Sequence, residues 1–231
     1  MKVVILAGGL GTRISEYTKL IPKPMIPLKG KPIIYYIMKH FYNYGFKNFY
    51  VAIGYKGIVL KNFFKKNNFP WDVKLIETGQ KTMTGGRLKR LKKHIGNERF
   101  FMTYGDGLSD VNLKSLLNFH IKNKKIATLT AVRPPARFGK IKLNQKNNVI
   151  LFREKSSLDE GWINGGFFVL EPEIFPLIKS DQTFFEKEPL QKLSQKRQLK
   201  AFQHKKIWQC MDTVRDKEIL EKLLLEKKLK F

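Results

Sequence analysis

A glycine-rich stretch near the start of the chain carries residue types that bind phosphate. Gly8, Gly9 and Gly11 leave the backbone free for positive φ and for close approach to a ligand. Successive backbone N–H groups in such a turn can point at phosphate oxygens. Thr12 adds a hydroxyl group, and Arg13 adds a planar fork of donors that suits phosphate. The stretch therefore indicates a loop that binds a ligand through its phosphate groups.

Two common phosphate-binding loops do not fit this stretch. A dinucleotide-binding loop needs a third glycine and a helix directly after it. Residues 9–14 lack that glycine, and Pro22, Pro24 and Pro27 exclude a long helix soon afterwards. The Gly-Lys-Ser/Thr of a P-loop is also absent. A tight strand-to-helix turn is the ordinary alternative, but Lys23, held between two prolines, supplies a second cation for phosphate.

Two aspartates later in the chain could hold a metal ion. Asp106 stands between Gly105 and Gly107 after an apolar segment, so its carboxylate could reach a ligand with little steric obstruction. Asp212 stands just before a segment with a helical pattern. Mg²⁺ usually takes one or two carboxylates beside substrate phosphates and water. The alternatives are a turn or helix cap for Asp106 and an N-cap for Asp212, and spacing alone does not show that the two meet.

The segments around these residues alternate between short strands and helices. Residues 3–6 form a short apolar run, typical of a strand buried on both faces of a parallel sheet. The alternation predicts an α/β fold with a doubly wound, mostly parallel sheet. Ligands bind such sheets outside the carboxyl ends of the strands, so the loop at 8–13 and the turn at 105–107 could face one crevice. Further strands are predicted at 49–53, 73–76, 100–104 and 126–133, and helices at 32–44, 58–66, 88–95 and 113–122.

The pattern becomes less regular after Pro134 and Pro135. Residues 141–143 and 149–152 surround a polar turn and predict a hairpin. The remaining segments predict a small β-rich subregion on the same sheet, followed by a last helix. They are a strand within 163–170, helices at 171–178 and 188–193, a strand at 199–202 and the C-terminal helix at 215–225.

Composition and charge limit the classes of protein to which the chain can belong. The 231 residues fit one domain, and a hydrophobic content of 42% is enough for a sizeable core. No apolar run approaches the roughly 18 residues of a membrane span, and Met1 leads directly into a strand rather than a secretory signal. A single cysteine, Cys210, fits a reducing cytoplasm. The formal net charge of +26 is dispersed, which favours weak binding to polyanions over a specific nucleic-acid function.

Several motifs, taken in order, resemble the sugar-phosphate nucleotidyltransferases, and most of all their glucose-1-phosphate cytidylyltransferase branch. The block at 83–90, Met-Thr-Gly-Gly-Arg-Leu-Lys-Arg, is more specific than the glycine loop, which many sugar nucleotidyltransferases share. The resemblance spans nearly the whole chain and implies a Rossmann-like nucleotidyltransferase fold. The other matching segments are 8–13 with 22–25, 78–79, 104–107, 164–168 and 211–213.

The resemblance also implies a role for each motif. Arg13, Lys23, Asp106 and Asp212 would form the catalytic set, with Mg²⁺ on the two aspartates. The nucleotide would contact Leu6, Ala7, Gly8, Gly9, Gly11, Thr12, Arg13, Lys23, Thr82, Arg87 and Gly105, and the sugar phosphate would contact Gly139, Glu154, Lys155, Asn164 and Gly165. For two of these residues the residue type alone allows an ordinary alternative: Lys155 could be a surface lysine, and Arg87 could be an ordinary cation at the start of a helix.

These roles imply a single nucleotidyltransferase domain over residues 1–231. Its parts would be a nucleotide-binding part at 1–133, a sugar-phosphate-binding part at about 134–205, and the second metal acid with the C-terminal helix at 206–231. The implied reaction is CTP + α-D-glucose 1-phosphate → CDP-glucose + pyrophosphate. We expect a cytoplasmic homo-oligomer with no membrane partner and no specific nucleic-acid partner. Its product resembles precursors of sugars in bacterial surface polysaccharides.

Two alternatives remain open at this point. A sister enzyme could use UTP, dTTP or another phosphate acceptor. An inactive basic protein could bind nucleotides or nucleic acid without turnover. Direct displacement needs no protein nucleophile, which agrees with the absence of a Gly-x-Ser-x-Gly motif and of a Cys/His pair.

Overall fold

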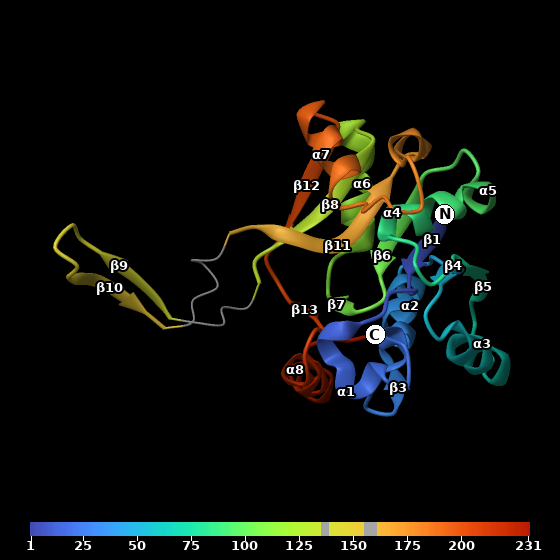
Figure 1. The fold of residues 1–231 in the computed structure, drawn as a ribbon, viewed down its shortest axis with the longest axis horizontal. Helices are drawn as coiled ribbons and strands as arrows, with labels where there is room; N and C mark the ends of the chain where they lie inside the picture. Colours follow the sequence, from blue (N-terminus) through green and yellow to red (C-terminus); the bar gives the residue numbers. More distant parts are fainter. Residues whose placement is uncertain (135–138, 155–160) are drawn as a thin grey trace.

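The fold is built on a central sheet of seven strands. The computed structural model describes residues 1–134, 139–154 and 161–231. Neighbouring strands pair in parallel except around β11, which runs antiparallel to both of its neighbours. The sheet is therefore mostly parallel, as predicted (Figure 1). Across the sheet the strands are β12 (Leu199–His204), β8 (Ala127–Val132), β11 (Ile163–Leu170), β6 (Phe100–Tyr104), β1 (Lys2–Leu6), β4 (Asn48–Ile53) and β5 (Asp72–Glu77).

Helices cover both faces of the sheet and enclose two hydrophobic cores. The side chains of β1 alternate between them, with Val3 and Ile5 in one core and Val4 and Leu6 in the other. This is the period-2 pattern of a strand buried on both faces. One core is closed by α2 (Ile33–Asn43), α3 (Gly57–Lys66), α6 (Leu113–Asn123) and α8 (Val214–Leu225), and the other by α4 (Thr84–Arg90), α5 (Lys92–Ile95), η4 (Pro172–Leu177) and α7 (Glu188–Gln195).

Two helical segments differ from the sequence prediction. The helix expected from Leu88 begins four residues earlier, at Thr84, although Gly85 and Gly86 disfavour a helix. The backbone of residues 181–185 lies so close to these glycines that a Cβ atom on Gly86 would come within 2.4 Å of the Asp181 carbonyl oxygen. The segment predicted as a helix at 171–178 forms the 3₁₀ helix η4, which contains two prolines.

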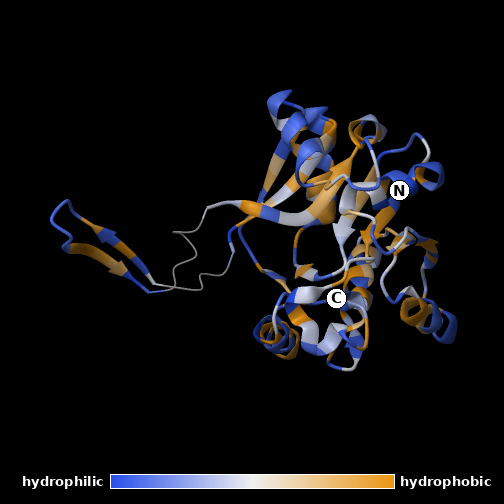
Figure 2. Cartoon of the chain, viewed as in Figure 1, coloured by the Kyte–Doolittle hydropathy of each residue, from blue (hydrophilic) through white to orange (hydrophobic). Residues whose placement is uncertain are grey.

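In the part of the chain that the structure describes, three two-stranded ribbons lie outside the central sheet. They are β2 (Pro27–Leu28) with β3 (Lys31–Pro32), β7 (Gly107–Ser109) with β13 (Trp208–Cys210), and β9 (Lys140–Leu143) with β10 (Val149–Arg153). The β9–β10 ribbon is the predicted hairpin. It projects away from the sheet (Figure 1), and hydrophobic residues make up part of both of its strands (Figure 2). Several of their side chains are exposed. Among the described residues, no helix is long and apolar enough to cross a membrane.

Candidate active site

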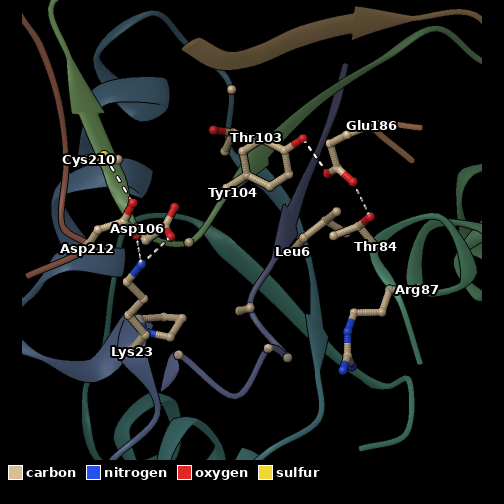
Figure 3. Close-up of a pocket in the computed structure, with 18 of the residues that line it drawn as sticks. Leu6, Lys23, Thr84, Arg87, Thr103, Tyr104, Asp106, Glu186, Cys210 and Asp212 are labelled. Atoms are coloured by element: carbon tan, nitrogen blue, oxygen red, sulfur yellow. Dashed lines mark hydrogen bonds and ion pairs between the residues drawn. The ribbon is translucent and has the colours of Figure 1, made fainter. Parts of the chain in front are cut away.

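A pocket of about 570 Å³ opens at the carboxyl ends of β1 and β6 (Figure 3). This volume suits a small ligand. All residues predicted to contact the nucleotide line it, from Leu6 at the end of β1 to Gly105 after β6. Asp106 and Asp212 line it too. The structure therefore brings segments from most of the chain to one place, where the sequence predicted that strand ends would meet.

The conformation of the glycine loop depends on the side chains that pack against it. It leads from β1 into η1 (Thr12–Ile14) and the single turn α1 (Ser15–Thr18). Gly11 has a φ of 66°, and its carbonyl oxygen accepts a hydrogen bond of 3.1 Å from Thr18 Oγ1. A Cβ atom on Gly8 would lie 2.1 Å from a guanidinium nitrogen of Arg87, so a larger residue there would displace the Arg87 side chain. Gly9, by contrast, has open space around it and can approach a ligand.

Arg87 lies beneath this loop and is only 3% exposed. Its Nη1 donates to Thr78 Oγ1 at 2.7 Å and to the Gly79 carbonyl oxygen at 2.8 Å. Burial lowers the pKa of the Arg87 guanidinium. The side chain is therefore a buried support that links α4 to the loop after β5, and not an ordinary surface cation at a helix start. Thr82, also buried, lines the pocket beside it.

Lys23, Asp106 and Asp212 converge on one point of the pocket wall (Figure 3). Lys23 lies on η2 (Lys23–Met25) and is 7% exposed. Its Nζ donates to Asp106 Oδ2 at 2.7 Å and to Asp212 Oδ1 at 2.6 Å. Burial alone would lower the pKa of Lys23, but the two carboxylates outweigh burial and raise it. The two aspartates, which spacing alone could not bring together, therefore meet.

The β7–β13 ribbon explains how these two acids meet. Gly107, directly after Asp106, pairs with Cys210, two residues before Asp212. The Met211 N–H donates to the Asp106 carbonyl oxygen at 2.8 Å. The backbones that carry both carboxylates are thus bonded to each other, although a hundred residues separate them in sequence.

Asp212 is not the N-cap of α8, so that alternative is wrong. Thr213 caps the helix, because its hydroxyl oxygen accepts from the Asp216 N–H at 3.2 Å. The Asp216 carboxylate reaches back and accepts from the N–H groups of Thr213 and Asp212 at 2.9 and 3.1 Å. This capping box fixes the backbone of Asp212 and leaves its carboxylate free to face the pocket. Asn112 likewise caps α6, so Asp106 is no helix cap either.

Two carboxylates that converge on Lys23 fit the requirements of Mg²⁺. Among the described residues, no cluster of three or more His, Cys, Asp or Glu side chains could hold a metal ion. A magnesium ion between Asp106 and Asp212 would therefore take its other ligands from substrate phosphates and water, as Mg²⁺ commonly does. The exposed side chain of Arg13 pairs with the outer oxygen of Asp212, at the mouth of this site.

The residues predicted for the sugar phosphate are divided by the structure. Asn164 and Gly165, on β11, line the pocket. The Asn164 Oδ1 atom accepts from the Gly166 N–H at 2.9 Å, within an irregular part of the β8–β11 pairing. Gly139 and Glu154 lie at the base of the β9–β10 hairpin and do not line the pocket. Lys155 lies outside the described residues.

Sequence reasoning missed several residues that line the pocket. Tyr104 belongs to the matching segment 104–107, but the resemblance implied no role for it. In the structure its hydroxyl donates to Glu186 at 2.6 Å. Burial, followed by the charge of Glu186, raises the pKa of Tyr104. Cys210 also lines the pocket, where burial followed by the neighbouring carboxylates raises the pKa of its thiol to about 12. Glu186 carried no signal in the sequence, because it belongs to none of the matching motifs.

The family comparison matches almost the whole chain. The model of the nucleotidyl transferase family matches residues 2–217. The glucose-1-phosphate cytidylyltransferase of Salmonella typhi is 46% identical, with 96% of this chain and 95% of the relative aligned. A probable glucose-1-phosphate cytidylyltransferase of Bacillus subtilis is 39% identical, over 94% of this chain and 93% of the relative.

More distant relatives act on other nucleotides and sugars. The D-glycero-α-D-manno-heptose 1-phosphate guanylyltransferase of Campylobacter jejuni is 33% identical, over 87% of this chain and 90% of the relative. Among solved structures, HddC from Yersinia pseudotuberculosis, complexed with GMP-PN, has a TM-score of 0.77 and 26% identity, and the match covers 96% of this chain and 99% of that chain. The family fold is thus shared by enzymes whose names specify different bases.

Proposed function

The chain belongs to the nucleotidyl transferase family, and from this premise we propose that it transfers a cytidylyl group from CTP to α-D-glucose 1-phosphate. Pyrophosphate and CDP-glucose are the products. The high coverage and 46% identity with a relative of that activity support this choice over a uridylyl or thymidylyl transferase. The observation that carries the proposal is the convergence of Lys23, Asp106 and Asp212 beside a glycine loop in one pocket.

We assign the two substrates to two walls of this pocket. The glycine loop, Arg13 and Lys23 hold the triphosphate, while Thr82, Arg87 and Gly105 contact the nucleoside. Asn164 and Gly165, on the β11 wall, contact the sugar phosphate. We also assign Gly139, Glu154 and Lys155 to the sugar phosphate. Gly139 and Glu154 do not line the pocket, and Lys155 lies outside the described residues.

The reaction needs positioning and charge stabilisation rather than a protein nucleophile. A phosphate oxygen of glucose 1-phosphate forms a bond to the α-phosphorus of CTP, and the bond from that phosphorus to the bridging oxygen breaks. Lys23 and Arg13 donate hydrogen bonds to the departing pyrophosphate, where negative charge accumulates. Asp106 and Asp212 would hold Mg²⁺, which would offset the charge of the triphosphate.

A screen for pyrophosphate release tests the proposal. The purified protein is assayed with CTP, UTP, dTTP and GTP, each with a set of sugar 1-phosphates and Mg²⁺. We expect the highest kcat/KM for CTP with glucose 1-phosphate. A higher value for UTP or dTTP would make the chain a sister enzyme. Nucleotide binding without pyrophosphate release from any pair would favour the inactive binding protein.

The metal assignment is tested by replacing Asp106 with alanine. We expect kcat to fall by about 10²–10³-fold, since one of two carboxylates that place the metal is lost, while the melting temperature stays near that of the wild type. Asp72→Ala, at an exposed position on β5, is the matched control and should keep full activity. Near-normal turnover by folded Asp106→Ala would exclude the metal role.

We also propose that the enzyme is a cytoplasmic homo-oligomer with no specific nucleic-acid partner. The exposed apolar side chains of the β9–β10 hairpin support self-association. The wide dispersal of basic residues along the chain supports weak binding to polyanions without sequence readout.

A further inference from the structure

Glu186 presents a carboxylate to the pocket on the wall away from the two aspartates (Figure 3). It lies in the segment before α7 and is half-buried. Its Oε1 accepts from the Tyr104 hydroxyl and its Oε2 from the Thr84 hydroxyl, both at 2.6 Å. Among the described residues, no lysine or arginine forms an ion pair with it, although the chain carries a net charge of +26. Because this carboxylate faces the pocket without such a cation, we consider a bound substrate as its partner.

The two hydroxyl donors are themselves held in place. Tyr104 ends β6, and its ring lies so close to Gly166 of β11 that a Cβ atom there would come within 2.7 Å of the ring. The ring also meets Phe168 edge to face, with the centroids 6.0 Å apart. Thr84 is the first residue of α4, and its hydroxyl oxygen accepts from the Phe185 N–H at 2.9 Å. The orientation of Glu186 is therefore fixed by the sheet on one side and by α4 on the other.

The chemistry of this site excludes phosphate as its partner. An ionised carboxylate only accepts hydrogen bonds, and each oxygen has lone pairs beyond the one that its hydroxyl donor occupies. It repels anions, whereas Lys23 and Arg13, elsewhere in the same pocket, attract them. Within the two proposed substrates, Glu186 therefore suits an uncharged part that bears O–H or N–H donors.

The contacts of Tyr104 favour the sugar over the base. The amide Nδ2 of Asn164 lies 3.5 Å from the Tyr104 hydroxyl oxygen. Asn164 belongs to β11, the strand that supplies the proposed sugar-phosphate contacts. The hydroxyl of Tyr104 thus joins Glu186 to the sugar side of the pocket.

We propose that Glu186, oriented by Tyr104 and Thr84, accepts a hydrogen bond from a hydroxyl group of the acceptor sugar and determines which sugar 1-phosphates are used. The proposal rests on the proposed function for the reaction class, but not on the identity of the base. Loss of this acceptor weakens sugar binding and removes the penalty for sugars that lack the matching hydroxyl. Buried polar groups of this kind commonly supply such discrimination, because an incorrect ligand leaves them unpaired.

The test compares Glu186→Gln with Glu188→Gln under steady-state conditions. Glu188 is a matched control because it lies two residues further on, does not line the pocket and pairs with Lys179 and Lys192. We expect Glu186→Gln to raise the KM for glucose 1-phosphate about tenfold, with kcat and the KM for CTP changed less than twofold. Glu188→Gln should match the wild type in all three values.

Deoxy sugars identify the hydroxyl group that is recognised. Wild-type kcat/KM is measured with the 2-, 3-, 4- and 6-deoxyglucose 1-phosphates, and we expect one of them to lose at least tenfold. In Glu186→Gln, removal of that hydroxyl group should cause no further loss of kcat/KM, and the relative kcat/KM values of the other three analogues should match those of the wild type. Tyr104→Phe keeps the carboxylate and removes one orienting donor. It should change the relative kcat/KM for the same analogue in the same direction, but by a smaller factor than Glu186→Gln.

A rise in the KM for CTP alone would overturn the proposal, because it would assign Glu186 to the base. Unchanged sugar discrimination in Glu186→Gln and Tyr104→Phe would also overturn it and would leave Glu186 a structural residue.

If another nucleotide proves to be the substrate, the proposed base is wrong but the same comparison is made with that nucleotide. If no pair turns over, the proposed function fails, and calorimetric binding of glucose 1-phosphate to the wild type and the two variants decides the role of Glu186. Equal affinities would then reject it.

Discussion

At the residue scale, the ammonium group of Lys23 occupies the place where two carboxylates converge. Carboxylates so close together repel each other unless a positive charge lies between them. Lys23 supplies that charge here, with its Nζ 2.7 and 2.6 Å from Asp106 and Asp212. A magnesium ion held by the same two carboxylates would lie close to this ammonium group and would be repelled by it. We therefore expect the metal and the lysine to compete, so that metal binding would release Lys23 toward the triphosphate.

Replacing Lys23 with methionine should separate these two roles. Removing one partner of a fully buried ion pair costs about 3–5 kcal/mol, and the partial exposure of both aspartates lowers our expectation to about 1–3 kcal/mol without metal. The variant should then gain more stability from Mg²⁺ than the wild type gains, because no ammonium group competes for the acids. Thermal unfolding at increasing Mg²⁺ concentrations measures both effects.

Lys61→Met is the matched control for this prediction. Lys61 pairs with Glu77 at 2.7 Å, but both side chains are about half exposed, so the loss should be within about 1 kcal/mol and independent of Mg²⁺. Equal responses to Mg²⁺ in Lys23→Met and the wild type would show that Lys23 does not compete with the metal.

At the element scale, the elements that were predicted well are those that local pattern determines. The apolar runs of β1 and β6 and the glycine loop between sheet and helix can all be read from neighbouring residues. The β7–β13 ribbon could not be read in this way, because it pairs residues 107–109 with 208–210 and each strand has only three residues. Glu186 was missed for the same reason, since only tertiary packing brings Tyr104 and Thr84 to it. Local sequence thus predicted the glycine loop that lines the pocket but not Glu186 on the opposite wall.

Helix α2 gives a pH dependence that follows from its burial. His40, on the last turns of α2, is 5% exposed, and its Nε2 bonds to the Val111 carbonyl oxygen at 2.9 Å. Burial lowers the pKa of His40 to about 4 from 6.5, against smaller effects of that hydrogen bond and of Asp110 that raise it. Between pH 6.5 and 4 the unfolded chain therefore binds a proton that the folded chain does not. Stability falls as the pH falls through this window, by up to about 3 kcal/mol from this group.

His40→Gln tests this linkage, because glutamine keeps a polar side chain and does not titrate. Urea unfolding of both proteins at several pH values from 7 to 4 gives the difference in unfolding free energy. We expect the difference to be constant above pH 6.5 and to shift by up to about 3 kcal/mol toward the variant near pH 4. Any loss of packing caused by the substitution contributes only to the part of this difference that does not change with pH. A difference that does not change with pH would contradict the neutral, buried state of His40.

At the scale of the whole molecule, the order of the strands explains why the pocket lies where it does. From β1 the chain moves to β4 and β5 on one side and then returns to β6 on the other side of β1. This reversal is a topological switch point, and ligands of open α/β sheets bind in the crevice at such points. The sequence predicted that strand ends would face a crevice. It could not give the strand order, because the pairing of β1 with both β4 and β6 depends on packing over the whole chain.

The β9–β10 hairpin exposes apolar side chains that packing within one chain does not explain. Apolar side chains of both strands are exposed, among them Ile141, Leu143, Val149 and Phe152 at 52%, 48%, 56% and 67%. Leu143 lies opposite Val149, and Ile141 lies opposite Phe152, so the two pairs extend across the ribbon. Contiguous exposed apolar surface of this kind marks contact sites rather than ordinary solvent-facing ribbon.

We expect this surface to be covered by a second copy of the chain. Light scattering after size exclusion should give the wild type a mass that is a multiple of 27.0 kDa. Replacing Ile141 and Phe152 together with lysine places two charges on the surface, and desolvating them would cost more than the lost apolar contact. The mass should then approach 27.0 kDa, while the melting temperature measured at low concentration stays close to that of the wild type, because neither side chain belongs to the two cores.

Ile58→Lys, at an equally exposed position on α3, controls for added charge and should leave the mass unchanged. A wild-type mass of one chain at micromolar concentration would refute self-association through the hairpin, and an unchanged mass in the double variant would place the contact elsewhere.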